Sequence, residues 1–195
     1  GGDYTNPLTA MDNLATWCGY PAVTNPCLLK IMPGVYNIGT NSLRMQQYVD
    51  IEGSGKNVTR IIGNQSNDGA AVSNNNAGAI SGVIMGASNS ELRSLSVESN
   101  GYFSLAVMNY LASPSISDVG IIASGFDNVG YGIYNNSSND EIKNVEISNA
   151  YEGIYNADSS PSLNHITISN CVRGINANVG AGWIGSSLKI NNANI

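Results

Sequence analysis

One hydrophobic pattern recurs along the chain. Apolar residues occupy the first, fourth and sixth positions of a six-residue phrase, and the residues between them are polar or small. Copies of the phrase lie at residues 92–97, 116–121, 142–147, 163–168 and 190–195. Their first residues are 24, 26, 21 and 27 positions apart (116−92, 142−116, 163−142 and 190−163). A fixed internal period of this size is typical of solenoids, in which each repeat packs only on its neighbours.

The same ladder extends upstream. Residues 28–31 and 49–51 are apolar strand signals 21 positions apart (49−28). Adding one period predicts a rung at residues 70–72, and adding another reaches Leu92. The pattern therefore predicts about eight coils.

A second strand signal lies in each coil. The motif Gly-Ile-Tyr-Asn at residues 132–135 and 153–156 returns as Gly-Ile-Asn at 174–176, with a looser copy at 106–109. In a strand, the isoleucine would point inward and the next residue outward. Between the strands lie small polar turns rich in asparagine, which tolerates the left-handed backbone of a tight corner. These features predict an all-β fold: a single-stranded right-handed parallel β-helix.

The N-terminal region differs from the rest. Residues 7–17 carry apolar side chains at helical spacing and predict a short capping helix over the open end of the stack. Cys18 and Cys27 follow, nine positions apart in a proline-containing loop. This spacing favours a disulfide over two free thiols, and a disulfide requires an oxidising compartment. We expect one domain, residues 1–195, with cap and loop at 1–27 and coils at 28–195.

Composition excludes some partners. The 195 residues carry a net charge of −6 and show no basic stripe, which argues against nucleic acid. No apolar stretch approaches the roughly 18 residues that span a bilayer, so we expect no membrane insertion. Only 11% of the residues are charged, and asparagine, serine and glycine fill the polar positions.

Several segments carry a resemblance. Residues 2–5 (Gly-Asp-Tyr-Thr), the helical segment, 28–36, 48–55 and 59–63 resemble the opening of pectinesterases, members of the pectin-lyase-like superfamily. The later Gly-Ile-Tyr-Asn and Ser-Pro-Ser-Leu coils are similar to tandem β-helix repeats of uncharacterised bacterial secreted or surface proteins. Together the resemblance covers nearly the whole chain and implies a right-handed parallel β-helix.

The resemblance does not extend to catalytic motifs. Pectinesterases use glutamines, two aspartates and an arginine on central coils, whereas Gln46, Gln47 and Gln65 fall too early here. The Leu-Arg-Ser-Leu run at residues 92–95 has no matching aspartate pair. The carboxylate cluster of pectate lyases and the Asp, His and Arg-x-Lys set of polygalacturonases are missing too. We assign no catalytic residue.

Metal and cofactor signals are also missing from the sequence. His165, the single histidine, lies between two apolar strand positions and is predicted to be a surface residue. No ligand spacing suggests a metal. We expect neither a metal nor a cofactor.

Two tyrosines form the candidate binding feature. Tyr134 and Tyr155 are 21 positions apart and in register, with Met108 two rungs from Tyr155. We expect them on an outer face. Two interpretations remain: they stack on sugar rings or contact a neighbouring molecule, or they pack on each other and cover strand backbone.

The C-terminal rung is a candidate assembly edge. Ile190, Ala193 and Ile195 end the chain without a capping segment, and an open strand edge promotes association. Either further coils follow in the native chain or another copy covers this end. If another copy covers this end, the contact between copies would be head to tail and would build a filament.

Two classes of function follow. The first is an extracellular or cell-surface structural or adhesive module that binds polysaccharide or another copy of itself, and the sequence favours it. The alternative is a polysaccharide-active enzyme: a lyase, hydrolase or esterase. An enzyme predicts a carboxylate pair or cation cluster in a groove along one sheet, whereas a structural module predicts flat faces with no strongly shifted titrating groups.

Overall fold

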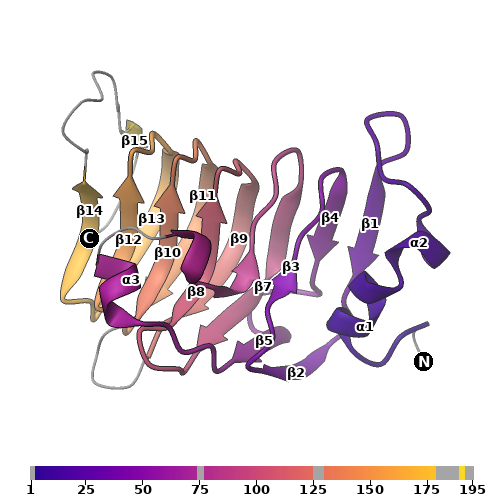
Figure 1. The fold of residues 1–195 in the computed structure, drawn as a ribbon, viewed down its shortest axis with the longest axis horizontal. Helices are drawn as coiled ribbons and strands as arrows, with labels where there is room; N and C mark the ends of the chain where they lie inside the picture. The colour runs from indigo at the N-terminus through magenta and orange to yellow at the C-terminus, as the bar shows by residue number, and fades with distance from the viewer. Residues whose placement is uncertain (1–2, 74–76, 125–129, 179–188, 192–195) are drawn as a thin grey trace.

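The structure is a computed structural model that describes residues 3–73, 77–124, 130–178 and 189–191. The chain winds into a stack of coils. Their strands lie side by side, and the stack extends along the long axis of the molecule (Figure 1). The pairings between named strands are parallel, as the repeat predicts. The described chain is therefore a parallel β-solenoid.

Each full coil contributes to three faces. Face 1 holds β1 (Cys27–Lys30), β4 (Val49–Glu52), β15 (Lys189–Asn191) and the first halves of β7 (Glu91–Ser99), β9 (Ser115–Ile122), β11 (Glu141–Ser148) and β13 (Ser162–Ser169). Face 2 holds β2 (Gly34–Gly39), β5 (Thr59–Gly63) and the second halves of β7, β9, β11 and β13. Face 3 holds β3 (Leu43–Arg44), β6 (Gly82–Met85), β8 (Leu105–Tyr110), β10 (Tyr131–Asn136), β12 (Glu152–Ala157) and β14 (Arg173–Asn178).

A left-handed residue bends each long strand between faces 1 and 2. Ser94, Asp118, Asn144 and His165 have φ angles of 55°, 55°, 53° and 54°. Each lies at the third position of the repeated phrase, between its first two apolar residues. The two-residue gap in the phrase is therefore the corner of the coil, and the one-residue gap that follows is ordinary strand alternation.

The number of turns is smaller than the period predicts. Face 1 runs from β1 through β4, β7, β9, β11 and β13 to β15, which makes six turns in the described chain rather than eight. Residues 70–72 are not a rung, because they lie in α3 (Gly69–Ser73), which the short 3-10 helix η1 (Ala77–Ala79) follows. Ile51 of β4 pairs directly with Leu92 of β7. The described residues between β5 and β6, 64–73 and 77–81, thus add no coil to the stack.

The interior contains the predicted isoleucine columns. Ile121, Ile147 and Ile168 stack in register and are at most 6% exposed. Ile133 and Ile154 form a second column and are fully buried, and Ile175 continues it at the partly buried end. Both predicted columns are confirmed.

The last residue of the Gly-Ile-Tyr-Asn motif builds a buried polar ladder. The Nδ2 atom of Asn109 donates to Oδ1 of Asn135 at 2.9 Å, and Nδ2 of Asn135 donates to Oδ1 of Asn156 at 2.9 Å. Nδ2 of Asn109 also donates to Oδ2 of Asp140 at 2.9 Å. All four side chains are buried. The asparagine of the motif is thus an interior structural residue.

The N-terminal cap consists of two helices instead of one, α1 (Pro7–Asp12) and α2 (Leu14–Trp17), because Asn13 interrupts the helix. The Asn6 side chain accepts a hydrogen bond from the backbone N–H of Leu8 at 2.8 Å and caps α1. Leu8 and Met11 pack against the core. A disulfide joins Cys18 to Cys27, with 6.0 Å between their Cα atoms, and ties α2 to the start of β1.

Candidate functional site

A charged cluster lies on the outer surface of face 1. The Arg93 guanidinium contacts three carboxylates from two coils. Its Nη2 lies 2.9 Å from Oε2 of Glu52, its Nη1 lies 3.4 Å from Oδ2 of Asp50, and the same Nη1 contacts Oε2 of Glu91. Lys30 of the first coil extends the cluster, with Nζ 3.3 Å from Oε1 of Glu52. These five residues alternate along β1, β4 and β7, so their side chains share the outer surface.

Hydrogen bonds keep the Glu52 carboxylate ionised. The Arg93 guanidinium and then the Lys30 ammonium hold the pKa of Glu52 below its ordinary value of 4.5. Asp50 also accepts a hydrogen bond from the backbone N–H of Glu91 at 2.8 Å, and Glu91 accepts one from the Ser117 hydroxyl. These carboxylates therefore accept hydrogen bonds from protein groups. A general acid must carry a proton that it can donate to the substrate, and these groups do not fit that role.

A polar groove adjoins the cluster where face 3 turns into face 1. It has a volume of about 440 Å³. Its lining comes from four successive coils: Asp50; Asn89, Ser90 and Glu91; Ser113, Pro114 and Ser115; and Asn139 and Glu141. With about 4.8 Å between neighbouring strands, the groove presents polar groups at a regular repeat along the stack.

Glu141 is the uncommitted carboxylate of this groove. Its side chain is exposed at the start of β11, and no described cation lies within ion-pair distance of it. On the same strand, Glu146 points out from face 2 instead, and its Oε1 lies 2.7 Å from Nζ of Lys56. Glu141 can therefore accept hydrogen bonds from a ligand in the groove.

Asp140 is the carboxyl group with the strongest shift, but it lies inside the fold. Burial raises the pKa of Asp140 to about 8, although the hydrogen bond from Asn109 acts in the opposite direction. The side chain is 1% exposed, and it does not line the groove formed by its neighbours Asn139 and Glu141. A group without access to substrate serves the fold and not a reaction.

The predicted tyrosine column is in register but not exposed, and this part of the prediction is wrong. Tyr134 pairs with Tyr155 and with Met108, and the two rings stack with centroids 4.8 Å apart. Tyr134 and Met108 are fully buried and Tyr155 is 8% exposed. The reason is that α3 lies over face 3 (Figure 1), where Ala71, Val72 and Ile80 pack in one apolar cluster with the tyrosines. The Tyr134 hydroxyl donates to the carbonyl oxygen of Val72 at 3.1 Å.

The remaining predicted residues fall in three places. His165 is exposed at the corner of β13. Ile190 lies in β15, whereas Ala193 and Ile195 lie outside the described residues. No group of three or more His, Cys, Asp or Glu side chains in the described ranges is placed to hold a metal ion. No helix in those ranges is long and apolar enough to cross a membrane.

Sequence reasoning missed the Arg93 cluster. The Leu-Arg-Ser-Leu run was visible, but two of the three acidic partners of Arg93, Glu52 and Asp50, lie 41 and 43 residues away in sequence on another coil. The signal that could have found them is register: Glu52 pairs with Arg93, so the two side chains must be neighbours. The incorrectly predicted rung at residues 70–72 placed an extra coil between Glu52 and Arg93, so the sequence did not predict their contact.

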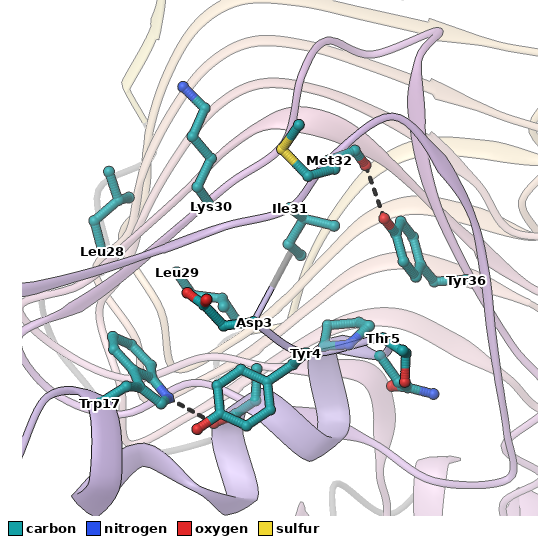
Figure 2. A pocket seen from close by; sticks show the side chains of 13 residues that line it. Asp3, Tyr4, Thr5, Trp17, Leu28, Leu29, Lys30, Ile31, Met32 and Tyr36 are labelled. Atoms are coloured by element: carbon teal, nitrogen blue, oxygen red, sulfur yellow. Dashed lines mark hydrogen bonds between the residues drawn. The ribbon is translucent and has the colours of Figure 1, made fainter. Parts of the chain in front are cut away.

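A second hollow lies at the N-terminal end, between the cap and the first coil (Figure 2). Its volume is about 490 Å³. Tyr4, Trp17 and Tyr36 form aromatic walls, and residues 28–32 form the opposite side. The indole N–H of Trp17 donates to the carbonyl oxygen of Ala10 at 2.7 Å, and the Tyr36 hydroxyl donates to that of Met32 at 3.0 Å.

Comparison with known proteins places the fold. No protein-family model and no curated protein matches the sequence. Among solved structures, a pectin methylesterase mutant in complex with a hexasaccharide has a TM-score of 0.58 at 16% identity, covering 100% of this chain and 58% of that one. Pectin methylesterase PemA from Erwinia chrysanthemi has a TM-score of 0.58 at 12% identity, covering 94% and 60%. The enzyme from Yersinia enterocolitica has a TM-score of 0.53 at 15% identity, covering 86% and 54%.

These likenesses establish that the chain shares the parallel β-helix architecture of the pectin methylesterase structures. The chain spans about three fifths of the length of the structures that it matches most fully. At this level of identity, the likeness shows the architecture alone.

Proposed function

We propose that this chain is a carbohydrate-binding module of an extracellular or cell-surface protein, and that it holds a polysaccharide in the groove of face 1 without cleaving it. The observation that carries the proposal is the groove itself. Its carboxylates, hydroxyls and amides come from four successive coils. Sugar hydroxyls both donate and accept hydrogen bonds, and such side chains offer both kinds of partner. A repeating polymer suits a surface that repeats at every coil.

The location is supported by the disulfide. The bond between Cys18 and Cys27 is of a kind that persists in oxidising compartments and is rare in the cytosol of most organisms. The low share of charged residues, 11% of the chain, suits a module that displays flat faces.

The chemistry of the groove favours binding over catalysis. Arg93 neutralises Asp50 and Glu91, and these carboxylates already accept hydrogen bonds from protein groups. Glu141 remains free to accept from a sugar hydroxyl. A hydrolase would need a second carboxyl group that carries a proton opposite it.

A polysaccharide-active enzyme is the second candidate. The grouping of Arg93 with three carboxylates on one sheet is the feature that an enzyme predicts, and pectin methylesterases share the fold. Under this alternative, Arg93 would orient an acidic substrate. The two functions separate in one set of assays, because only the enzyme releases a product.

The test pairs binding with product release. Isothermal titration calorimetry would be run with neutral polysaccharides (β-glucan, xylan and galactan) and with pectin, and the same mixtures assayed for reducing ends, unsaturated ends and methanol. Glu141→Gln should weaken binding by about tenfold, because the charged carboxylate acceptor is replaced by a neutral amide oxygen that accepts a weaker hydrogen bond. Glu146→Gln is the matched control, since it makes the same change on the same strand but on face 2.

The outcomes are distinct. Weaker binding by Glu141→Gln alone, with no product, supports the proposal. Equal binding by both variants removes the groove as the site. Steady product release that Arg93→Ala abolishes would overturn it in favour of the enzyme.

A further inference from the structure

The hollow at the N-terminal end runs along the edge of a strand. Five consecutive residues, 28–32, line it, although Leu28, Lys30 and Met32 point to one side of β1 and Leu29 and Ile31 to the other (Figure 2). Side chains that alternate cannot all face one hollow. The hollow therefore faces the backbone edge that these residues share.

That edge has no strand beside it. Among the described strands, β1 pairs with β4 alone. The backbone N–H groups of Cys27 and Ile31 donate to Tyr48 and Glu52 on the β4 side, at 2.9 and 2.7 Å. Because alternate residues of a strand address opposite neighbours, the N–H and C=O groups of Leu28 and Lys30 point toward the hollow.

The walls of the hollow suit apolar side chains. The polar atoms of Trp17 and Tyr36 are already committed to the carbonyl oxygens of Ala10 and Met32, so both rings are fixed and present apolar faces. The Oδ1 atom of Asn6 likewise accepts the capping hydrogen bond of α1. Beside these rings, an extended backbone would find the alternating N–H and C=O groups of the β1 edge as hydrogen-bond partners.

The charge at the hollow is negative. Asp3 points toward β1 in Figure 2, and no described cation pairs with it. Lys30, the cation on β1, instead points away from the hollow and lies against Glu52. A basic residue in the occupant would therefore meet an uncompensated carboxylate.

We propose that the hollow between the cap and β1 binds an extended peptide segment of a partner protein, which adds a parallel or antiparallel strand to the free edge of β1. The segment carries apolar side chains at alternate positions and a basic residue beside Asp3. It is about four residues long, because β1 has 4 residues and an added strand pairs residue for residue.

Backbone methylation of the probe gives the direct test. The probe is the peptide acetyl-Lys-Val-Thr-Val-Thr-Val-amide. Its binding to the full chain is followed by calorimetry and by the fluorescence of Trp17, the latter in a background that carries Trp183→Phe because the chain has two tryptophans. Two further peptides carry N-methyl groups on alternate nitrogens, one set in each register. One methylated peptide should bind about tenfold more weakly or worse and the other nearly as well as the parent, because only one register donates to β1.

Variants of Lys30 test the protein side. Lys30→Pro removes the backbone N–H that faces the hollow and leaves the ladder to β4 intact, and proline is tolerated on an edge strand. It should weaken binding about fivefold. Lys30→Ala is the matched control, because it removes the side chain and the contact with Glu52 but keeps the N–H; its affinity should be unchanged. Asp3→Asn should lower the affinity for the probe peptide. It should leave unchanged the affinity for a second peptide in which glutamine replaces the lysine.

Several results would overturn the inference. The first is no peptide binding at millimolar concentration. The second is equal loss, or no loss, with both methylated peptides, since hydrophobic contact alone would then explain binding. The third is a Trp17 response to cellohexaose or xylohexaose but not to peptide, which would make the hollow a sugar site. If Lys30→Pro fails to fold by circular dichroism, the methylated peptides still decide.

Discussion

Replacing Asp140 with asparagine tests the interior polar ladder. In the folded chain burial keeps Asp140 protonated, with a pKa of about 8 against an ordinary value of 3.8. In the unfolded chain the carboxyl group ionises near its ordinary value. Between these two values the folded state binds one more proton than the unfolded state, so stability falls as the pH rises. The stabilising contribution is fully present below about pH 4 and is lost as the pH rises through the folded-state pKa of about 8.

The magnitude follows from the distance to neutral pH. Three pH units separate the ordinary value from pH 7, and each unit is worth about 1.4 kcal/mol, so holding the proton costs at most about 4 kcal/mol at pH 7. Asparagine has nearly the same shape, and its Oδ1 can accept the hydrogen bond from Asn109 that Oδ2 of Asp140 accepts now. It has no proton to hold. Asp140→Asn should therefore be more stable at neutral pH.

The assay is urea unfolding of both proteins, followed by far-ultraviolet circular dichroism at half-unit steps from pH 4 to pH 8. The difference in free energy of unfolding should be small near pH 4 and grow by about 1.4 kcal/mol per pH unit. Any fixed cost of the new amide group shifts this line without changing its slope. A difference that stays constant across the range would show that Asp140 is ionised in the folded chain and would refute the reasoning.

Three further substitutions probe packing. Ile147→Asp should abolish the folded central coils, because it places an unpaired charge in the dry interior; loss of the cooperative urea transition would show this, and a transition near that of wild type would contradict it. Tyr134→Ala should cost about 3–5 kcal/mol in the same assay, since it empties a buried site under α3 and removes the bond to Val72, whereas a cost below 1 kcal/mol would mean that the ring is exposed in solution. Gly132→Ala should cost about 1–3 kcal/mol, because the added Cβ would lie 2.6 Å from Cγ2 of Ile147 and against the backbone of the next coil; thermal unfolding that matches wild type would argue against this close approach.

The sequence predicted the interior of the coils well. The phrase at residues 142–147 placed Ile142, Val145 and Ile147 inside, because a strand alternates and every coil must bury the same positions. The same logic placed Tyr134 on the outside of its sheet. It could not show that α3 and Ile80 cover that surface, because alternation describes one strand and not what packs over it.

The errors arose where the chain leaves its period. Residues 70–72 are apolar and lie at the expected interval, but no strand forms there, because the segment is not held between two neighbouring coils. The Arg93 cluster needed the true coil count before its members became neighbours. The edge of β1 was predictable as an end of the stack, but the hollow beside it depends on how α1 and α2 are placed.

The segment between β5 and β6 has a consequence for how such a chain can change. Ile51 and Leu92 are 41 residues apart, yet they pair as the corresponding residues of any two adjacent coils do. Distance along the sequence is thus decoupled from position along the axis, and the loop between β5 and β6 behaves as an open insertion point. A longer or shorter segment at this corner would alter what covers Tyr134 while leaving the order of the stack unchanged. Evolution or a protein engineer could therefore graft new surfaces there and treat the coils beneath as a fixed frame.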